Sequence, residues 1–302
     1  MNYPRVYNIM KPVLKALLFA CSMLASTAQA QADPALFQPG LISDGGVFGL
    51  ALSPDGNQAF WVQSQGRRIA LRIMSSSRVN GVWQTPQIAS FSRDTQWKDI
   101  DPAISPDGKT LIFQSNRPVP GKPERKGFDI WASSKTADGW GAAYHLGNVI
   151  NTDASESSAS IAANGNIYFM KENEEAAQQS DLYVSRFING AYQTPENLGP
   201  PINSKERESN PYVAPDESYL IYFSTRPGGY GDVDLYISFR EQGKWTEAVN
   251  LGQTINSAAA AEFCPLVHQG RIYLSRQVKQ GDRFIENIYS FSFDAEQYRS
   301  RR

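Results

Sequence analysis

Four acidic side chains recur at intervals of about fifty residues, each just before an apolar segment: Asp99, Glu156, Glu208 and Glu262. Carboxylates at matching positions of a repeat can converge, and oxygen ligands suit a hard cation such as calcium. A pair about 5–5.5 Å apart would instead suit a retaining glycosidase. The other interpretation is structural, with each carboxylate accepting backbone N–H groups inside its own repeat. Repetition favours the structural role, because binding sites usually do not repeat, but it leaves both roles open.

Long connecting segments supply a second set of candidates. The loops that follow the second apolar stretch of each repeat differ in length and composition, and uneven loops on a regular scaffold are where binding usually occurs. On this loop face we single out Trp97, Arg117, Arg226 and Tyr230. The two aromatic residues are candidates for stacking on a sugar. The two arginines are expected to form ion pairs across the second hairpin, Arg117 with Asp129 and Arg226 with Asp234.

Other constellations that carry chemistry are missing from the sequence. His145 and His268 fall at different positions of the repeat, so we expect no shared metal site. No Gly-x-Ser-x-Gly motif, phosphate loop or dinucleotide fingerprint occurs. Cys264 is the one cysteine after residue 30 and is expected to be a small buried residue without a disulfide partner. We therefore assign no catalytic residue, expect no enzyme and no cofactor, and leave calcium open.

The first thirty residues differ from the rest of the chain. Three basic residues precede an apolar run at 16–25, and Ala28-Gln29-Ala30 has the small-x-small form of a cleavage site. This pattern predicts a secretory signal peptide over residues 1–30, followed by a mature domain over 31–302 in the periplasm or secreted. An N-terminal membrane anchor and lipidation at Cys21 are the alternatives. The formal net charge of -1 gives no reason to expect a nucleic-acid partner.

One turn motif repeats along the mature chain. Ser-Pro-Asp-Gly at 53–56 recurs at 105–108, and weaker copies lie at 162–165, 214–217 and 268–270. Proline presets the second turn position, and Asp-Gly or Asn-Gly completes a tight reversal of the chain. Each copy therefore marks a hairpin between two strands.

Four short strands are expected in each repeat. In the fourth repeat, apolar segments flank the turn at 212–213 and 220–223, a third follows at 234–236, and a fourth opens with Gly243-Lys244-Trp245. Four strands in about fifty residues, without helical periodicity, are typical of a β-propeller blade. The five turn motifs predict an all-β propeller of about five blades, although the length would also suit six.

The ends of the chain fit a closed ring. The fifth repeat stops without a fourth strand, and residues 35–43 resemble the end of such a strand. We expect this N-terminal segment to complete the last blade, which would remove two exposed sheet edges.

The repeats also resemble a known family. The fourth repeat runs from Glu208 through Ser224-Thr225-Arg226-Pro227 and a glycine-rich loop to Asp234-Leu235-Tyr236. This order is similar to the WD40-like repeat of TolB-type propellers, and the similarity covers nearly all of the chain after residue 30. The resemblance implies the fold but no particular activity, because relatives include periplasmic scaffold proteins, propellers fused to peptidases and some lyases.

These observations predict an exported binding or scaffold module. We expect it to bind a protein or cell-envelope component through the loop face, with no transmembrane segment after signal cleavage. The alternative is a carbohydrate-active enzyme or carbohydrate binder that uses the carboxylates at the mouth of the central channel. A fold analogy alone does not identify the ligand, and the oligomeric state is not specified by the sequence.

Overall fold

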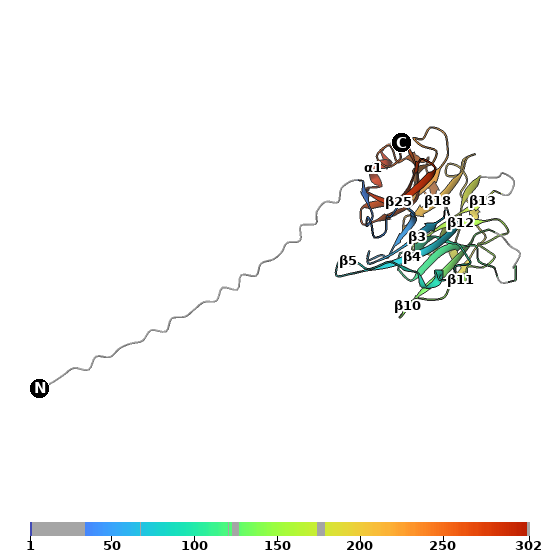
Figure 1. The fold of residues 1–302 in the computed structure, drawn as a ribbon. Helices are drawn as coiled ribbons and strands as arrows, with labels where there is room; N and C mark the ends of the chain where they lie inside the picture. The colour runs from blue at the N-terminus through green and yellow to red at the C-terminus, as the bar shows by residue number, and fades with distance from the viewer. Residues whose placement is uncertain (2–33, 67, 120, 123–126, 174–178, 301–302) are drawn as a thin grey trace. The chain divides into compact units, whose positions relative to one another are not determined.

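The computed structural model describes residues 1, 34–66, 68–119, 121–122, 127–173 and 179–300. Apart from Met1, the predicted signal peptide lies outside the described residues. From residue 34 onward the described chain is built of antiparallel sheets with very little helix (Figure 1). Among the described residues, no helix is long and apolar enough to cross a membrane.

Three long strands form the inner part of each blade. The innermost strands are β2 (Val47–Leu52), β7 (Asp99–Ile104), β12 (Glu156–Ile161), β18 (Glu208–Val213) and β23 (Ala260–His268). The second strands are β3 (Gln58–Gln65), β8 (Thr110–Ser115), β13 (Ile167–Glu172), β19 (Tyr219–Ser224) and β24 (Arg271–Gln280). The third strands are β4 (Ala70–Val79), β9 (Asp129–Thr136), β14 (Ser180–Ser185), β20 (Asp234–Glu241) and β25 (Arg283–Ser292). Each innermost strand contacts the next one, and β23 contacts β2. The predicted five-blade propeller is therefore confirmed, and the alternative of six blades is wrong.

The outer edges of the blades are short. The fourth strands are β6 (Gln87–Ile88), β11 (Tyr144–His145), β17 (Glu196–Asn197) and β22 (Val249–Asn250). The Gly-aromatic segments that were expected to open these strands form small hairpins before them: β5 (Val82–Trp83), β10 (Gly139–Trp140), β21 (Lys244–Trp245), and the pair β15 (Phe187–Ile188) with β16 (Ala191–Tyr192). Short helical turns lie at η1 (Ser90–Ser92) and α1 (Glu296–Arg299).

The repeated turn joins the first two strands of each blade. In the first blade the hydroxyl of Ser53 donates to the Asp55 carboxylate at 2.5 Å and accepts the backbone N–H of Gln58 at 2.8 Å. Gly56 completes the reversal with a φ of 70°, which favours glycine. Apolar side chains from adjacent blades then pack between the sheets, and Trp61 and Tyr222 are among the most deeply buried.

The N-terminal segment completes the fifth blade. Strand β1 (Ala35–Leu36) pairs antiparallel with β25, and the next residue, Phe37, donates its backbone N–H to the carbonyl of Ile288 at 2.9 Å. The Phe37 ring is 6% exposed and packs edge-on against Trp83 and Tyr273, with ring centroids 5.9 and 5.5 Å away. The expected closure by an N-terminal strand is confirmed.

Removal of the Phe37 ring tests this closure. We expect Phe37→Ala to lower the free energy of unfolding by about 3–5 kcal/mol, because truncation of a buried phenylalanine leaves a cavity. Leu41→Ala is the matched control in the same segment, since Leu41 is 37% exposed, and we expect a change within about 0.5 kcal/mol. Urea denaturation measures both, and equal stabilities for the two variants would contradict closure through Phe37.

Candidate functional site

A repeated backbone irregularity lies at the centre of the propeller. Every innermost strand shifts register against its neighbour in its middle, as between Ile100 and Ala103 in β7. At each shift one residue takes a positive φ, between 46° and 64°: Gly49, Asp101, Ser158, Asn210 and Cys264. Such angles are uncommon for residues other than glycine, and a β-bulge redirects a side chain out of the normal alternation. We call these five residues the bulge ring.

Asp101 is the hub of the bulge ring. Its carboxylate accepts hydrogen bonds from Ser158 Oγ at 2.7 Å, Asn210 Nδ2 at 3.3 Å and Cys264 Sγ at 3.5 Å. Asn210 also donates to Ser158 Oγ at 2.8 Å. At Gly49 a Cβ atom would lie 3.3 Å from Asp101 Oδ1, so a side chain there would crowd the hub. The ring therefore joins side chains from the second to the fifth blade, and the glycine of the first blade leaves room for Asp101.

The surroundings of Asp101 disfavour its charge. Burial raises the pKa of the Asp101 carboxyl group, and its three hydrogen-bond donors and the positive charge of Arg68 only partly oppose that shift. Burial also raises the pKa of the Cys264 thiol, with a further contribution from Asp101. The centre of the channel thus holds a carboxyl group with an increased tendency to be neutral and able to donate a proton.

A wide cavity of about 420 Å³ lies on the side where the innermost strands begin. Its aromatic walls are Phe48, Phe128, Phe223 and Phe263, and its charged or amide side chains include Arg68, Lys98, Asp101, Arg207 and Gln277. The Arg68 guanidinium lies 4.6 Å from the centroid of the Phe48 ring, and the Arg207 guanidinium lies 5.3 Å from that of Phe223. This cavity therefore combines aromatic faces with fixed hydrogen-bond donors.

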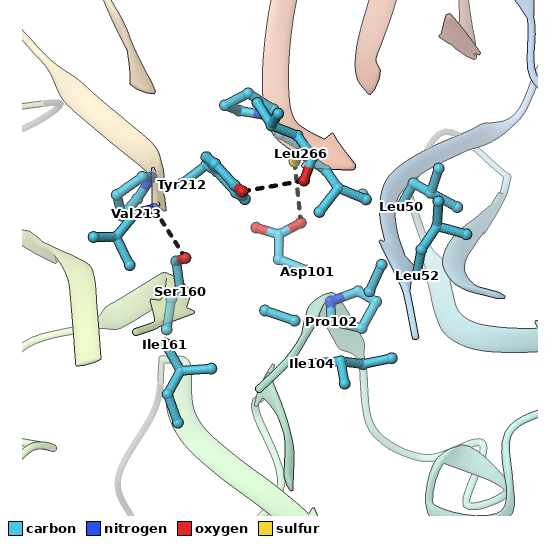
Figure 2. A pocket seen from close by; sticks show the side chains of 18 of the residues that line it. Leu50, Leu52, Asp101, Pro102, Ile104, Ser160, Ile161, Tyr212, Val213 and Leu266 are labelled. Carbon is cyan, nitrogen blue, oxygen red and sulfur yellow. Dashed lines mark hydrogen bonds between the residues drawn. The ribbon is translucent and has the colours of Figure 1, made fainter. Parts of the chain in front are cut away.

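A narrow cavity of about 200 Å³ lies on the opposite side, where the hairpin turns are. Figure 2 shows its apolar lining around Asp101, with Leu50, Ile104 and Leu266 among the labelled residues. The Tyr212 hydroxyl at this side donates to the carbonyl of Val267 at 3.0 Å, so it is already engaged (Figure 2). Asp101 lines both cavities, which makes the bulge ring their common boundary.

The four recurring acids lie elsewhere. Asp99, Glu156, Glu208 and Glu262 are all 0% exposed, and none lines either cavity. Asp99, Glu156 and Glu208 are the first residues of their innermost strands, and Glu262 is the third residue of β23. Each stands two residues before a member of the bulge ring. The expected ring of carboxylates at the channel mouth does not form, because these carboxylates have no surface on the channel.

Each of these acids has partners near its own blade. Glu208 accepts the backbone N–H of Ser204 at 3.0 Å and its hydroxyl at 2.6 Å. Glu156 and Glu262 accept backbone N–H groups from the preceding blade connection in the same way. Burial raises the pKa of Glu262 to about 7, although Arg276 at 2.8 Å opposes the shift. In the described ranges, no group of three or more His, Cys, Asp or Glu side chains is arranged to hold a metal.

The expected arginine pairings are wrong. Arg117 forms its ion pair with Asp99 at 2.8 Å, and Arg226 pairs with Glu208 at 3.2 Å. Both side chains turn back toward the innermost strand because Nε donates to a serine hydroxyl at the end of the second strand, Ser115 or Ser224.

The expected acidic partners bind other groups. Asp129 lies 2.6 Å from His145 Nε2, and Asp234 accepts the backbone N–H of Gly231 at 3.0 Å. Of the loop-face candidates, Trp97 is partly buried and Tyr230 is 42% exposed. Neither of these, nor Arg117 or Arg226, lines the wide or the narrow cavity.

The sequence interpretation missed the bulge ring. Its residues share no type, so the position does not repeat as a motif does. One signal was available: each ring residue from the second blade on stands two positions after a recurring acid, and three are followed by proline, at 102, 211 and 265. A residue that varies at a fixed position of an otherwise regular repeat is a candidate for function rather than structure.

Comparison with known proteins supports the fold. No protein-family model and no curated protein matches the chain. Among solved structures, the chain is similar to an endo-arabinase from Bacteroides thetaiotaomicron, with a TM-score of 0.55, 13% identity, and coverage of 84% of this chain and 96% of that one. It is also similar to an alpha-L-arabinofuranosidase from Lactobacillus brevis, with a TM-score of 0.53, 10% identity, and coverage of 85% and 94%.

A weaker similarity concerns TolB from Acinetobacter baumannii. The TM-score is 0.45 at 16% identity, with 83% of this chain covered, and the chain spans 56% of that protein. A likeness this weak supports no conclusion about function. The expectation that the protein is not an enzyme must be corrected, because several structural neighbours at TM-scores of 0.50–0.55 are enzymes by name, two of them endo-arabinanases and one an alpha-L-arabinofuranosidase.

The hub carboxyl group predicts a pH dependence of stability. The pKa of Asp101 is raised by folding, so the unfavourable charge is absent below about pH 4, where the group is protonated in both states. As the pH rises through the raised pKa, wild-type stability falls. We expect the melting temperature of Asp101→Asn, relative to that of the wild type, to increase as the pH is raised from 4 to 8. Asparagine suits the positive φ of this position, as Asn210 shows in the fourth blade. A constant difference over this range would contradict the raised pKa.

Neutralising one of the buried acids should lower the stability of the fold, and calcium should not change this effect. We expect Glu208→Gln to lower the free energy of unfolding by about 1–3 kcal/mol, because it weakens charge-assisted bonds to Ser204 and Arg226. Glu206→Gln is the control, since Glu206 is exposed two residues earlier, and should change stability by less than about 0.5 kcal/mol. Denaturation with and without calcium checks this, and a calcium-dependent stabilisation that Glu208→Gln abolishes would support a cation site instead.

Proposed function

We propose that this protein is a carbohydrate-active β-propeller that binds a saccharide in the wide cavity against the bulge ring. The observation that carries the proposal is the base of that cavity, where Asp101, Ser158 and Asn210 are joined in one hydrogen-bonded cluster. Carboxyl, hydroxyl and amide groups are the side chains that pair with sugar hydroxyl groups, which both donate and accept. A concave site with aromatic walls and a few convergent polar groups is the usual form of a small-molecule site.

The walls of the cavity also suit a sugar ring. Phe48, Phe223 and Phe263 supply apolar faces, and the guanidinium groups above them supply fixed donors. The volume of about 420 Å³ lies within the range of small-ligand pockets. The endo-arabinase and the alpha-L-arabinofuranosidase that share the fold support a saccharide as the ligand class.

We assign Asp101 as the acid that contacts the bound saccharide. Among the described residues that line the two cavities it is the one carboxyl group, and its raised pKa increases the neutral form that a general acid requires. We further propose that the blades are WD40-like repeats of the TolB type and that the protein is exported, supported by the Ser-Pro-Asp-Gly turns and by the composition of residues 1–30. These proposals place the saccharide in the cell envelope.

Deletion of the hub side chain tests the proposed function. We expect Asp101→Gly to weaken binding of a saccharide found in a screen of neutral and acidic oligosaccharides by at least about tenfold, the loss of one strong hydrogen bond. Glycine is compatible with the backbone there, because Gly49 occupies the equivalent position of the first blade. Asp107→Asn, in the exposed turn of the same blade, is the control and should bind as the wild type does.

Isothermal titration calorimetry measures affinity, and chromatography of the sugar after incubation detects cleavage. Melting curves of each variant establish that it is folded. A wild-type protein that binds no oligosaccharide of the screen, or an Asp101→Gly variant that binds with unchanged affinity, would contradict the proposal.

A further inference from the structure

We propose that the wide cavity selects a saccharide that carries an anionic group, such as the carboxylate of a uronic acid. The inference rests on the proposed function, because it concerns the ligand of the same cavity. Among the residues that the structure describes, three cations line this cavity, Arg68, Lys98 and Arg207, against one acid, Asp101. The whole chain has a formal net charge of -1, so this excess of positive charge is local.

Two of the three cations have no carboxylate partner. Among the residues that the structure describes, neither Lys98 nor Arg207 lies within ion-pair distance of an acid, and Glu172 attracts Arg207 only from farther away. Arg68 is the exception, since it pairs with Glu286, which also accepts a hydrogen bond from Gln277. The cavity therefore offers two cations that have no ion-pair partner among the described residues.

The two guanidinium groups are held in place and repel each other. Arg207 packs on Phe223, and Arg68 packs on Phe48 and on Phe263, the latter with 5.9 Å to the ring centroid. Burial lowers the pKa of Arg207, Glu172 opposes this shift, and the positive charge of Arg68 adds to it. An anionic group bound beside them would relieve this repulsion. Guanidinium groups bind carboxylates in a bidentate geometry, which fixes the orientation of the ligand as well as its charge.

The division of the cavity suggests how an acidic sugar lies in it. Arg68 and Arg207 are exposed, whereas the bulge ring is joined by buried hydrogen bonds, so the anionic substituent and the hydroxyl groups of the sugar would meet different parts of the protein. The aromatic side chains of the cavity would pack against the ring of the sugar. A neutral sugar would make the same contacts at the base but would leave Lys98 and Arg207 unpaired.

Matched pairs of sugars test this selectivity. The probes are glucuronate with glucose, galacturonate with galactose, and mannuronate with mannose, each as monomer and trimer, measured by isothermal titration calorimetry with the wild-type protein. We expect the acidic member of at least one pair to bind about tenfold or more tightly than its neutral partner. Its affinity should fall as salt is added, because salt screens charge interactions at an open site. Affinity for the neutral partner should not depend on salt.

Removal of these two cations, Lys98 and Arg207, is the decisive comparison. In Lys98→Met/Arg207→Met we expect the acidic sugar to bind no better than its neutral partner, while Lys109→Met, which removes an exposed cation at a hairpin turn, should retain the preference. Melting curves show whether each variant is folded. Neutral sugars that bind as well as acidic ones, or a preference that survives in the double variant, would overturn this inference and leave the proposed function intact. A protein that binds neither kind of sugar would overturn both.

Discussion

The geometry of the channel depends on one backbone constraint, a left-handed residue in the middle of each innermost strand. In a regular strand, successive side chains alternate between the two faces, so two neighbours do not point the same way. The bulge breaks this alternation, and Ile100 and Asp101 both line the wide cavity as a result. Because all five blades carry the bulge in the middle of the innermost strand, three side chains and Gly49 meet around Asp101. The cavities on either side are the spaces that the bulge ring separates.

The buried acids two residues before the bulge ring stabilise that arrangement. All four carboxylates are fully buried. Glu156, Glu208 and Glu262 join their strands to the preceding blade connection, and Asp99 pairs with Arg117. A buried charge that is fully hydrogen-bonded is costly to disturb, because removal of one partner leaves the other uncompensated. Two acids thus lie two residues apart on the same strand with different surroundings: Asp99 is buried beside Arg117, and Asp101 lines both cavities.

Local patterns made the fold predictable, whereas the site depends on non-local geometry. The Ser-Pro-Asp-Gly turns act within six residues, as the bond from Ser53 to Gln58 shows, so the sequence revealed the number of blades and the closing strand. The bulge is invisible in period-two patterning, because Asp101, Ser158 and Asn210 adopt a positive φ without glycine. The ion-pair partner of an arginine is also not set by sequence spacing. Arg117 was expected to pair with Asp129, but its bond to the Ser115 hydroxyl directs the guanidinium group toward Asp99.

The pairing of the N-terminal segment with β25 in the fifth blade, which we call the seam, has a consequence for how the chain folds. Most sheet contacts join strands that are neighbours in sequence, but the hydrogen bond from Ser43 to Ile288 joins residues 245 positions apart. The entropy lost in closing a loop grows only slowly with its length, yet contacts of long sequence separation slow the search for the native state. Four blades can assemble in chain order before this seam closes. Docking of the N-terminal segment is therefore the natural last step, and a nascent chain completes its propeller only after the fifth blade has been synthesised.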